Sequence, residues 1–493
     1  MSNLRSFGPP LCGVLFVSSV LVPRAVAQTP PGPTQAQSPP ASNSPDAATE
    51  ARRRSLEEAR AALPQAQPGA WQPQQPGNTS TGLRLQQGPA GTATGVNAAG
   101  SFRLIDISLD VIGSVGTSTA RNDVIQQLQG GHHDPKQRGF TMQQAELALA
   151  GAVDPYFRLD SHITSVIDPD GETIVELEEA YATTTSLPHG LQVKMGHYLT
   201  EFGRINPVHL HDWDWGDQPV VVSRVFGGDG LRAPGARVSY IPQTDVYYDF
   251  QLGVQNASGE TAKSFLANDE VYGEEPIGGR FFQERDVRGL KDSLWTARAS
   301  SSLTWNDTNV FNYGVSALYG PNATGNDGET FVYGADFVYL WRPVSTDKGW
   351  PFFKLQGEWI GRVFDASAQI DENDPLNGAD DVVVPGDTLR DHGFFLQGLW
   401  GFQRGWSTGL RGEYATGSGE SYDAVADTFS RAADFDRTDR LRISPVLVFQ
   451  PSEFSRIRLQ YNYDESDHLG DSGEHSVWIT FQTLIGVHQP HRM

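Results

Sequence analysis

The chain is 493 residues long, carries a formal net charge of −22 at pH 7 and contains a single cysteine, Cys12. This excess of carboxylates disfavours a nucleic-acid partner, because proteins that bind nucleic acids use basic residues to neutralise phosphates. One cysteine excludes both a disulfide framework and a metal site built from several thiolates.

Residues 1–27 have the features of a secretory signal peptide. Arg5 precedes an apolar run over Leu11–Val22, and Ala25-Val26-Ala27 fits the small-x-small pattern of a cleavage site. Cleavage there would also remove Cys12. The apolar run is roughly half of the twenty residues that a membrane-spanning helix needs, and no later segment approaches that length without charges. We therefore expect an exported protein without membrane-spanning helices.

Residues 28–100 are rich in Pro, Gln, Ala, Gly, Ser and Thr and contain few large apolar residues. Such a segment cannot bury enough apolar surface to fold alone, so we predict a disordered periplasmic linker. Within it, residues 46–63 contain strong helix formers and are followed by Pro64, which predicts a short helix. This helix is either single and solvated or forms a short trimerising or cell-wall contact.

Residues 101–493 alternate apolar and polar residues in segments of about ten residues or more, which is typical of barrel strands. In one segment, Tyr248, Phe250 and Leu252 alternate with Asp249 and Gln251. Side chains of a strand point alternately to opposite faces, so each segment has an apolar and a polar face. About 16 segments have this pattern, near residues 102–115, 138–152, 155–167, 173–186, 190–199, 231–242, 245–256, 294–305, 308–320, 330–342, 351–365, 391–403, 406–417, 438–450, 454–465 and 474–488.

The connections between these segments are alternately short and long. The long ones include residues 116–137, 200–230, 257–293, 366–390 and 418–437, and aromatic residues cluster beside the short ones. Membrane barrels combine short periplasmic turns, long external loops and an interfacial aromatic girdle. We therefore predict an all-β fold, a transmembrane antiparallel β-barrel of about 16 strands in the cell outer membrane, in contact with lipid and lipopolysaccharide. A soluble two-sheet protein is the alternative.

The third external connection, at 200–230, is the richest in charged and imidazole groups, and we expect it to fold into the barrel and narrow the lumen. The candidate constriction residues are Glu201, Arg204, His209, His211, Asp212, Asp214, Asp217, Arg224 and Arg232. Four of them, His209, His211, Asp212 and Asp214, form an alternative set of metal ligands, since imidazole and carboxylate bind zinc. Otherwise these groups hydrogen-bond within the loop and set its electrostatics.

Four motifs in this part of the chain resemble motifs of known outer-membrane barrel proteins: Glu178–Tyr181, Glu201–Pro207, His211–Asp214 and Gly230–Arg237. The region 140–255 resembles a group of poorly characterised barrel proteins that are sometimes labelled zinc-regulated or TonB-dependent outer-membrane receptors. More distantly, it resembles the phosphate-selective porins. The likeness to outer-membrane porins implies a homotrimer in which the third external loop lies inside the barrel.

A second group of charged residues lies on the polar faces of the predicted strands. These lumen-wall cations are Lys194, Arg237, Arg411, Arg440, Arg442, Arg456 and Arg458. In a ring of about 16 strands, the five C-terminal arginines would lie across the lumen from the acidic loop. One hypothesis is that they face the loop carboxylates and create a transverse field. The alternative is that they pair with neighbours such as Glu413 and Asp464.

Glu178 and Glu179 do not fit the alternation, because they are adjacent in one predicted strand. Strict alternation would turn one carboxylate toward lipid, at a depth-dependent cost of up to a few kcal/mol. A β-bulge, a rim position or a subunit interface would resolve this conflict, and we favour the interface or the bulge.

Together these features predict a porin that passes small hydrophilic or charged solutes by passive diffusion. We expect no cofactor and no enzymatic activity, because Gly-x-Ser-x-Gly, His-Glu-x-x-His and P-loop motifs are not found. The alternative function is an outer-membrane receptor or transporter for zinc or a metal complex. Such a receptor would require a folded plug before the barrel, and residues 28–100 are too polar to form one. A structural barrel whose linker contacts the cell wall is a third function.

Overall fold

The computed structural model describes residues 85–87, 93–97, 100–371, 382–469 and 473–486. The predicted signal peptide, the predicted helix at 46–63 and most of the predicted linker lie outside the described residues. Two short strands, β1 (Leu85–Gln87) and β2 (Ala93–Asn97), lie within the stretch that we expected to be disordered. They pair with each other, and β2 pairs with the start of β3 (Gly100–Ser118), so regular structure begins before residue 101.

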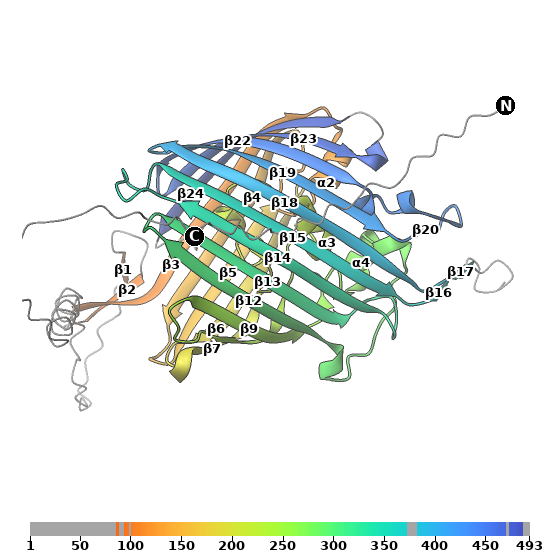
Figure 1. The fold of residues 1–493 in the computed structure, drawn as a ribbon, viewed down its shortest axis with the longest axis horizontal. Coiled ribbons are helices and arrows are strands. Elements are labelled where there is room, and N and C mark those ends of the chain that lie inside the picture. The colour runs from red at the N-terminus through yellow and green to blue at the C-terminus, as the bar shows by residue number, and fades with distance from the viewer. Residues whose placement is uncertain (1–84, 88–92, 98–99, 372–381, 470–472, 487–493) are drawn as a thin grey trace, which may run out of the picture. The chain divides into compact units, whose positions relative to one another are not determined.

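Sixteen strands form a closed antiparallel barrel, which confirms the predicted fold class (Figure 1). They are β3 (Gly100–Ser118), β4 (Gly139–Ala152), β5 (Phe157–Ile167), β6 (Thr173–Thr184), β7 (Leu191–Leu199), β8 (Arg232–Tyr240), β9 (Tyr247–Asn256), β12 (Ser293–Trp305), β13 (Asn309–Pro321), β14 (Glu329–Trp341), β15 (Phe352–Ala366), β18 (Asp387–Gln403), β19 (Trp406–Ser418), β22 (Arg440–Ser452), β23 (Ser455–Ser466) and β24 (Glu474–Gly486). Each strand pairs with the next one, and β24 pairs with β3 to close the ring.

Short elements occupy the connections. The helices are α2 (Asn122–Leu128), α3 (Val220–Phe226) and α4 (Asp269–Glu274), and the 3-10 turns are η1 (Pro188–Gly190), η2 (Leu210–Asp212), η3 (Ile277–Gly279), η4 (Leu290–Asp292), η5 (Arg431–Ala433), η6 (Phe435–Arg437) and η7 (Asp467–Leu469). Three small strand pairs are β10 (Ser258–Gly259) with β11 (Leu266–Ala267), β16 (Gln369–Asp371) with β17 (Val382–Val384), and β20 (Ser421–Asp423) with β21 (Thr428–Ser430). Among the described residues, no helix has the length and apolar character needed to cross a membrane.

The long connections follow β3, β7, β9, β15 and β19. Because neighbouring strands are antiparallel, all five leave the barrel at the same end. The other three connections at this end are short: residues 168–172 after β5, 322–328 after β13 and 467–473 after β23. The opposite end carries the short turns, as the rhythm of the sequence predicts.

The outer face of the barrel is apolar and the inner face is polar. In β9, Phe250 and Leu252 point outward and are 47% and 68% exposed, whereas the inward Gln255 is buried. A closed sheet with this outer surface suits the hydrocarbon of a bilayer, because all its main-chain groups find partners within the ring. The polar inner face can be buried only if other parts of the chain cover it.

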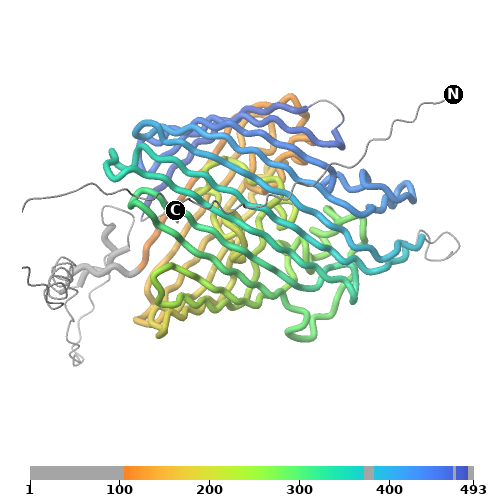
Figure 2. The backbone as a smooth tube through the Cα atoms, in the orientation of Figure 1, coloured from red at the N-terminus to blue at the C-terminus, as the bar shows by residue number. Residues whose placement is uncertain are grey.

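One part of the interior is filled by the connection between β7 and β8. From α3, Val221, Val222 and Phe226 pack in one apolar cluster with Ile360 of β15 and Phe395 of β18. Figure 2 shows the backbone of this connection, drawn in yellow to yellow-green, inside the ring of strands. The barrel therefore has a packed side as well as polar spaces.

We predict that Leu252→Arg destabilises the folded barrel in lipid by about 2–4 kcal/mol, because it places a charge on the outer face near the middle of β9. Urea titration in bilayers would measure the change. The control is Gln251→Arg, which places the same charge beside Asp249 on the inner face. Equal losses in both variants would contradict the assignment of the two faces.

Candidate functional site

The connection between β7 and β8, residues 200–231, is called the crossing loop below, because it contacts three separate parts of the barrel wall. Its first part lies against β13, β14 and β15. The Gly203 amide donates to Ser316 Oγ at 3.3 Å, and the Arg204 amide donates to Glu358 Oε2 at 3.0 Å. The Arg204 guanidinium pairs with Asp336 at 2.6 Å. These contacts fix the point where the loop leaves β7.

The middle of the crossing loop lies against β4, β5 and β6. His209 Nε2 lies 2.8 Å from Glu179 Oε2, and His209 Nδ1 lies 3.2 Å from Glu178 Oε2. His211 Nδ1 lies 2.9 Å from Glu146 Oε2, and the same glutamate contacts His162 Nδ1 at 2.6 Å. Three carboxylates and three imidazoles therefore form one network, called the His/Glu cluster here.

Ion pairs between imidazoles and carboxylates hold this cluster together. Burial alone would lower the pKa of His209, but Glu178 and Glu146 raise it well above the ordinary value. For His211, burial is likewise outweighed by Glu146, which raises the pKa to about 9. Both imidazoles thus carry a proton at neutral pH, and the loop is held to the wall by ion pairs in a partly desolvated site.

A β-bulge explains how two adjacent glutamates reach the same imidazole. The pairing of β5 with β6 shifts between His162, which faces Glu179, and Ile163, which faces Leu177. Glu178 is the extra residue, so both Glu178 and Glu179 turn inward. Of the three explanations drawn from the sequence, the bulge is the one that the strand register shows.

The third part of the crossing loop reaches β19, β22 and β23. Trp215 Nε1 donates to the Ser444 carbonyl oxygen at 2.9 Å, and the Gly216 amide donates to Gln460 Oε1 at 2.9 Å. Asp217 pairs with Arg411 and with Arg442, the latter at 3.3 Å. Although burial raises it, these two arginines lower the pKa of Asp217 to about 2.

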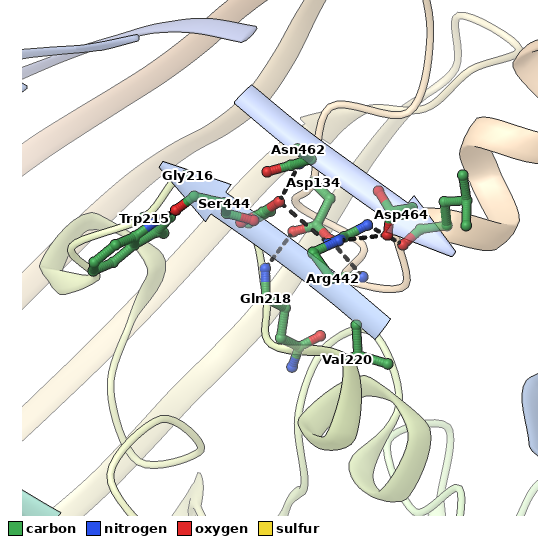
Figure 3. A network of polar contacts seen from close by, with 12 residues as sticks. Asp134, Trp215, Gly216, Gln218, Val220, Arg442, Ser444, Asn462 and Asp464 are labelled. Atoms are coloured by element: carbon green, nitrogen blue, oxygen red, sulfur yellow. Dashed lines mark hydrogen bonds and ion pairs between the residues drawn. The ribbon is translucent and has the colours of Figure 1, made fainter. Parts of the chain in front are cut away.

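Figure 3 shows that this anchor continues into the first long connection. Asp134 accepts a hydrogen bond from the Gln218 amide at 2.9 Å, and Arg442 donates to the Leu128 carbonyl oxygen at 2.7 Å. Arg442 also binds Asp464 at 2.7 Å. Burial, and then the nearby Asp217 charge, raise the pKa of Asp134 to about 7. Two long connections are thus tied to the same wall arginine.

The loop carboxylates and the arginines of the wall do not face each other across an open gap, as the hypothesis of a transverse field assumes. Glu201 pairs on its own side of the barrel with Lys194 at 2.7 Å and Arg237 at 3.0 Å. Asp214 pairs with Lys354 at 2.9 Å. The arginines of the far wall are covered and paired: Arg411 with Asp217 and Glu413, Arg440 and Arg442 with Asp464, Arg456 with the His211 carbonyl oxygen and Gln482, and Arg458 with Gln482. Because the loop crosses the lumen, Asp217 meets Arg411 and Arg442 of the wall directly, whereas the hydrogen bonds of Arg456 and Arg458 go to neutral oxygens.

Two of the predicted constriction residues lie away from the middle of the loop. Arg224 of α3 donates to the Thr438 carbonyl oxygen at 2.7 Å, next to the long connection after β19. Arg232 starts β8 and pairs with Glu176. Both are buried, so they hold the ends of the loop rather than face its central part.

The metal ligands proposed from the sequence do not converge as a set, because Asp214 is drawn to Lys354. Instead, one donor atom each from Glu146, His162 and His209 lie within 4.8 Å of one another. Sequence reasoning missed Glu146 and His162. Their positions on polar strand faces could be recognised, but the pairing of β4 with β5 that brings them together could not.

Two of the cavities that adjoin the crossing loop lie beside its middle part. The first, called the wall cavity, is lined by the His/Glu cluster with Asp110 and Lys194. The second, called the main cavity, has a volume of about 540 Å³ and is lined by Arg204, Asp214 and wall residues that include Asp249. Pro207, Val208 and Asp212 line both cavities, so the middle of the loop separates them.

No family model matches this sequence. A protein of Aquifex aeolicus described as uncharacterised is 29% identical over 384 residues, which cover 73% of this chain and 72% of that protein. Among solved structures, the outer membrane channel DcaP of Acinetobacter baumannii is 11% identical with a TM-score of 0.46, over 77% of this chain and 97% of that one. The anion-selective porin from Comamonas acidovorans is 8% identical with a TM-score of 0.43, over 77% and 99% of the two chains. At these values, neither likeness indicates a solute or a mechanism.

We predict that Asp217→Asn loosens the crossing loop, because it leaves the buried Arg411 and Arg442 without their shared counter-charge, a loss of about 3–5 kcal/mol. Hydrogen exchange of the amides in α3 should become faster, and the urea midpoint of the barrel should fall. Asp214→Asn is the control, since its partner Lys354 is partly exposed and the pair contributes at most about 1 kcal/mol. Unchanged exchange in Asp217→Asn would show that the loop is anchored elsewhere.

Proposed function

We propose that this protein is an outer-membrane channel through which small hydrophilic solutes diffuse passively. The observation that supports it most directly is a closed barrel with an apolar outer face whose lumen holds a polar cavity of about 540 Å³ beside an ordered loop. A barrel of this strand number has room for a water-filled passage between the wall and such a loop. Solutes would pass the crossing loop, which narrows the lumen.

The narrowest part of the passage would be bounded by the middle of the crossing loop on one side and the wall on the other. Arg204, paired with Asp336, and Asp214, paired with Lys354, lie at this boundary. Fixed charges of both signs favour hydrated solutes and exclude apolar ones, because an apolar solute would displace water from charged groups without replacing its hydrogen bonds.

The linings of the two cavities favour cations. Their carboxylates are Asp106, Asp110, Glu146, Glu179, Glu201, Asp212, Asp214 and Asp249, and their Lys and Arg side chains are Lys194, Arg204, Arg298 and Lys354. The protonated His209 and His211 reduce this carboxylate excess but do not cancel it. A negative lumen concentrates cations and repels anions, so the proposed channel prefers small cations over anions of equal size.

The proposal includes the setting expected from the sequence: a homotrimer embedded in outer-membrane lipid, with lipopolysaccharide around its external loops and no enzymatic step. The alternative, a receptor or transporter for zinc or a metal complex, would bind its cargo tightly without conducting ions. Conductance therefore separates the two functions.

We predict steady ohmic conductance when the purified protein is inserted into a planar bilayer. In Ser302→Cys, a thiol reagent added to the bath should lower the conductance, because Ser302 lines the main cavity. Cys12 lies in the predicted signal peptide, so the introduced thiol would be the reactive one. Leu252→Cys, on the outer face, is the control and should conduct normally after labelling. A barrel that binds metal tightly and carries no current would overturn the channel proposal.

We also predict that Asp249→Asn reduces the preference for cations. Asp249 lines the main cavity and accepts hydrogen bonds from Ser239 and Gln251, which an asparagine side chain can partly keep. The reversal potential in a salt gradient should move toward zero. Asp307→Asn, in the turn between β12 and β13, is the matched control, because that position has a positive φ that asparagine tolerates. Equal shifts in both variants would show that lumen charge does not set the selectivity.

A further inference from the structure

The His/Glu cluster contains more ligand atoms than its loop-anchoring contacts require. Glu146, His162 and His209 each bring one donor atom within 4.8 Å of the others. The imidazole rings of His162 and His209 also contact each other, with centroids 4.2 Å apart. We propose that these three residues bind a divalent transition-metal ion, with Zn²⁺ as the representative, where the crossing loop meets β4 and β5.

The donor set determines which class of metal fits. Two imidazoles with one or two carboxylates match the ligands of Zn²⁺ and its neighbours in the first transition series, whereas Ca²⁺ and Mg²⁺ prefer oxygen donors alone. Zinc–ligand bonds are about 2.0–2.2 Å long, so any two donor atoms near the 4.8 Å limit would have to move closer together to share one ion. Side-chain rotation can supply such a movement without moving the strands.

A further carboxylate supports this assignment independently. Glu178 is 6% exposed, and its Oε2 atom has no hydrogen-bond partner among the described residues, although it lies 3.2 Å from His209 Nδ1. The His209 Nδ1 atom is also buried without a hydrogen bond among the described residues. A buried carboxylate oxygen and a buried ring nitrogen that face each other without hydrogen-bond geometry are groups that a cation can satisfy.

The site joins two paired strands to the crossing loop and borders the wall cavity. Glu146 is on β4 and His162 is on β5, two strands that pair directly, while His209 comes from the crossing loop. The wall cavity touches all three side chains, so it gives an ion a route from water and has space for a water ligand. Bound metal would join the loop to the wall through coordinate bonds. If the barrel conducts as proposed above, bound metal would also lower its conductance.

Zinc binding to the purified, metal-stripped full chain would test the proposal by calorimetry. Wild type should bind one Zn²⁺ per barrel, and His162→Gln and His209→Gln should each lose affinity by at least about tenfold. His132→Gln is the control, because His132 pairs with Asp229 and does not line the wall cavity. X-ray absorption of the zinc-loaded wild type should show nitrogen and oxygen neighbours that include imidazole.

The variants must keep the barrel fold, which heat-dependent migration in gels reports. If His209→Gln fails to fold, zinc binding by His162→Gln and the X-ray absorption spectrum of the zinc-loaded wild type still test the metal site. Wild type that binds no zinc, or His162→Gln that binds zinc as wild type does, would overturn the metal site. A barrel that conducts but binds no zinc would overturn only the metal site. A barrel that binds zinc but does not conduct would overturn only the channel proposal.

Discussion

The pairing of β24 with β3 is the constraint on which the rest of the structure depends. An open sheet would leave a row of main-chain donors and acceptors at each edge, and hydrocarbon offers them no partners. Closing the ring satisfies them and divides every strand into an outward apolar face and an inward polar one. The polar face then becomes the wall of a lumen.

That lumen is not left empty, because the crossing loop spans it and contacts three separate parts of the wall. Its charged residues meet wall residues of opposite sign, as in the contacts of Asp217 with Arg411 and of Arg204 with Asp336. A buried charge without a counter-charge costs several kcal/mol, so such pairs specify one position of the loop even where they add little net stability. The loop and wall together define the spaces through which a solute could move.

The His/Glu cluster holds the crossing loop in position and also contains the proposed metal ligands. In the metal-free state, protonated His209 and His211 hold the loop against the carboxylates of β4 and β6. Of these residues, Glu146 and His209 would also be ligands in the proposed metal site, together with His162, so a bound ion would replace part of the loop-anchoring network. The proposed conductance and the proposed metal binding are separate properties that different measurements test.

The sequence by itself determined the strands, their order and the end of the barrel that carries the long connections, because strand side chains alternate with a period of two and turns have a distinct composition. It also located the loop at 200–230 and showed that Glu178 and Glu179 needed a bulge or an interface. The tertiary structure alone decided which charges meet. Asp217 lies more than two hundred residues from Arg442, and Glu146 reaches His209 only because the loop folds back over β4. Such contacts depend on ring closure and on the path of the loop, and neither leaves a local pattern in the residues involved.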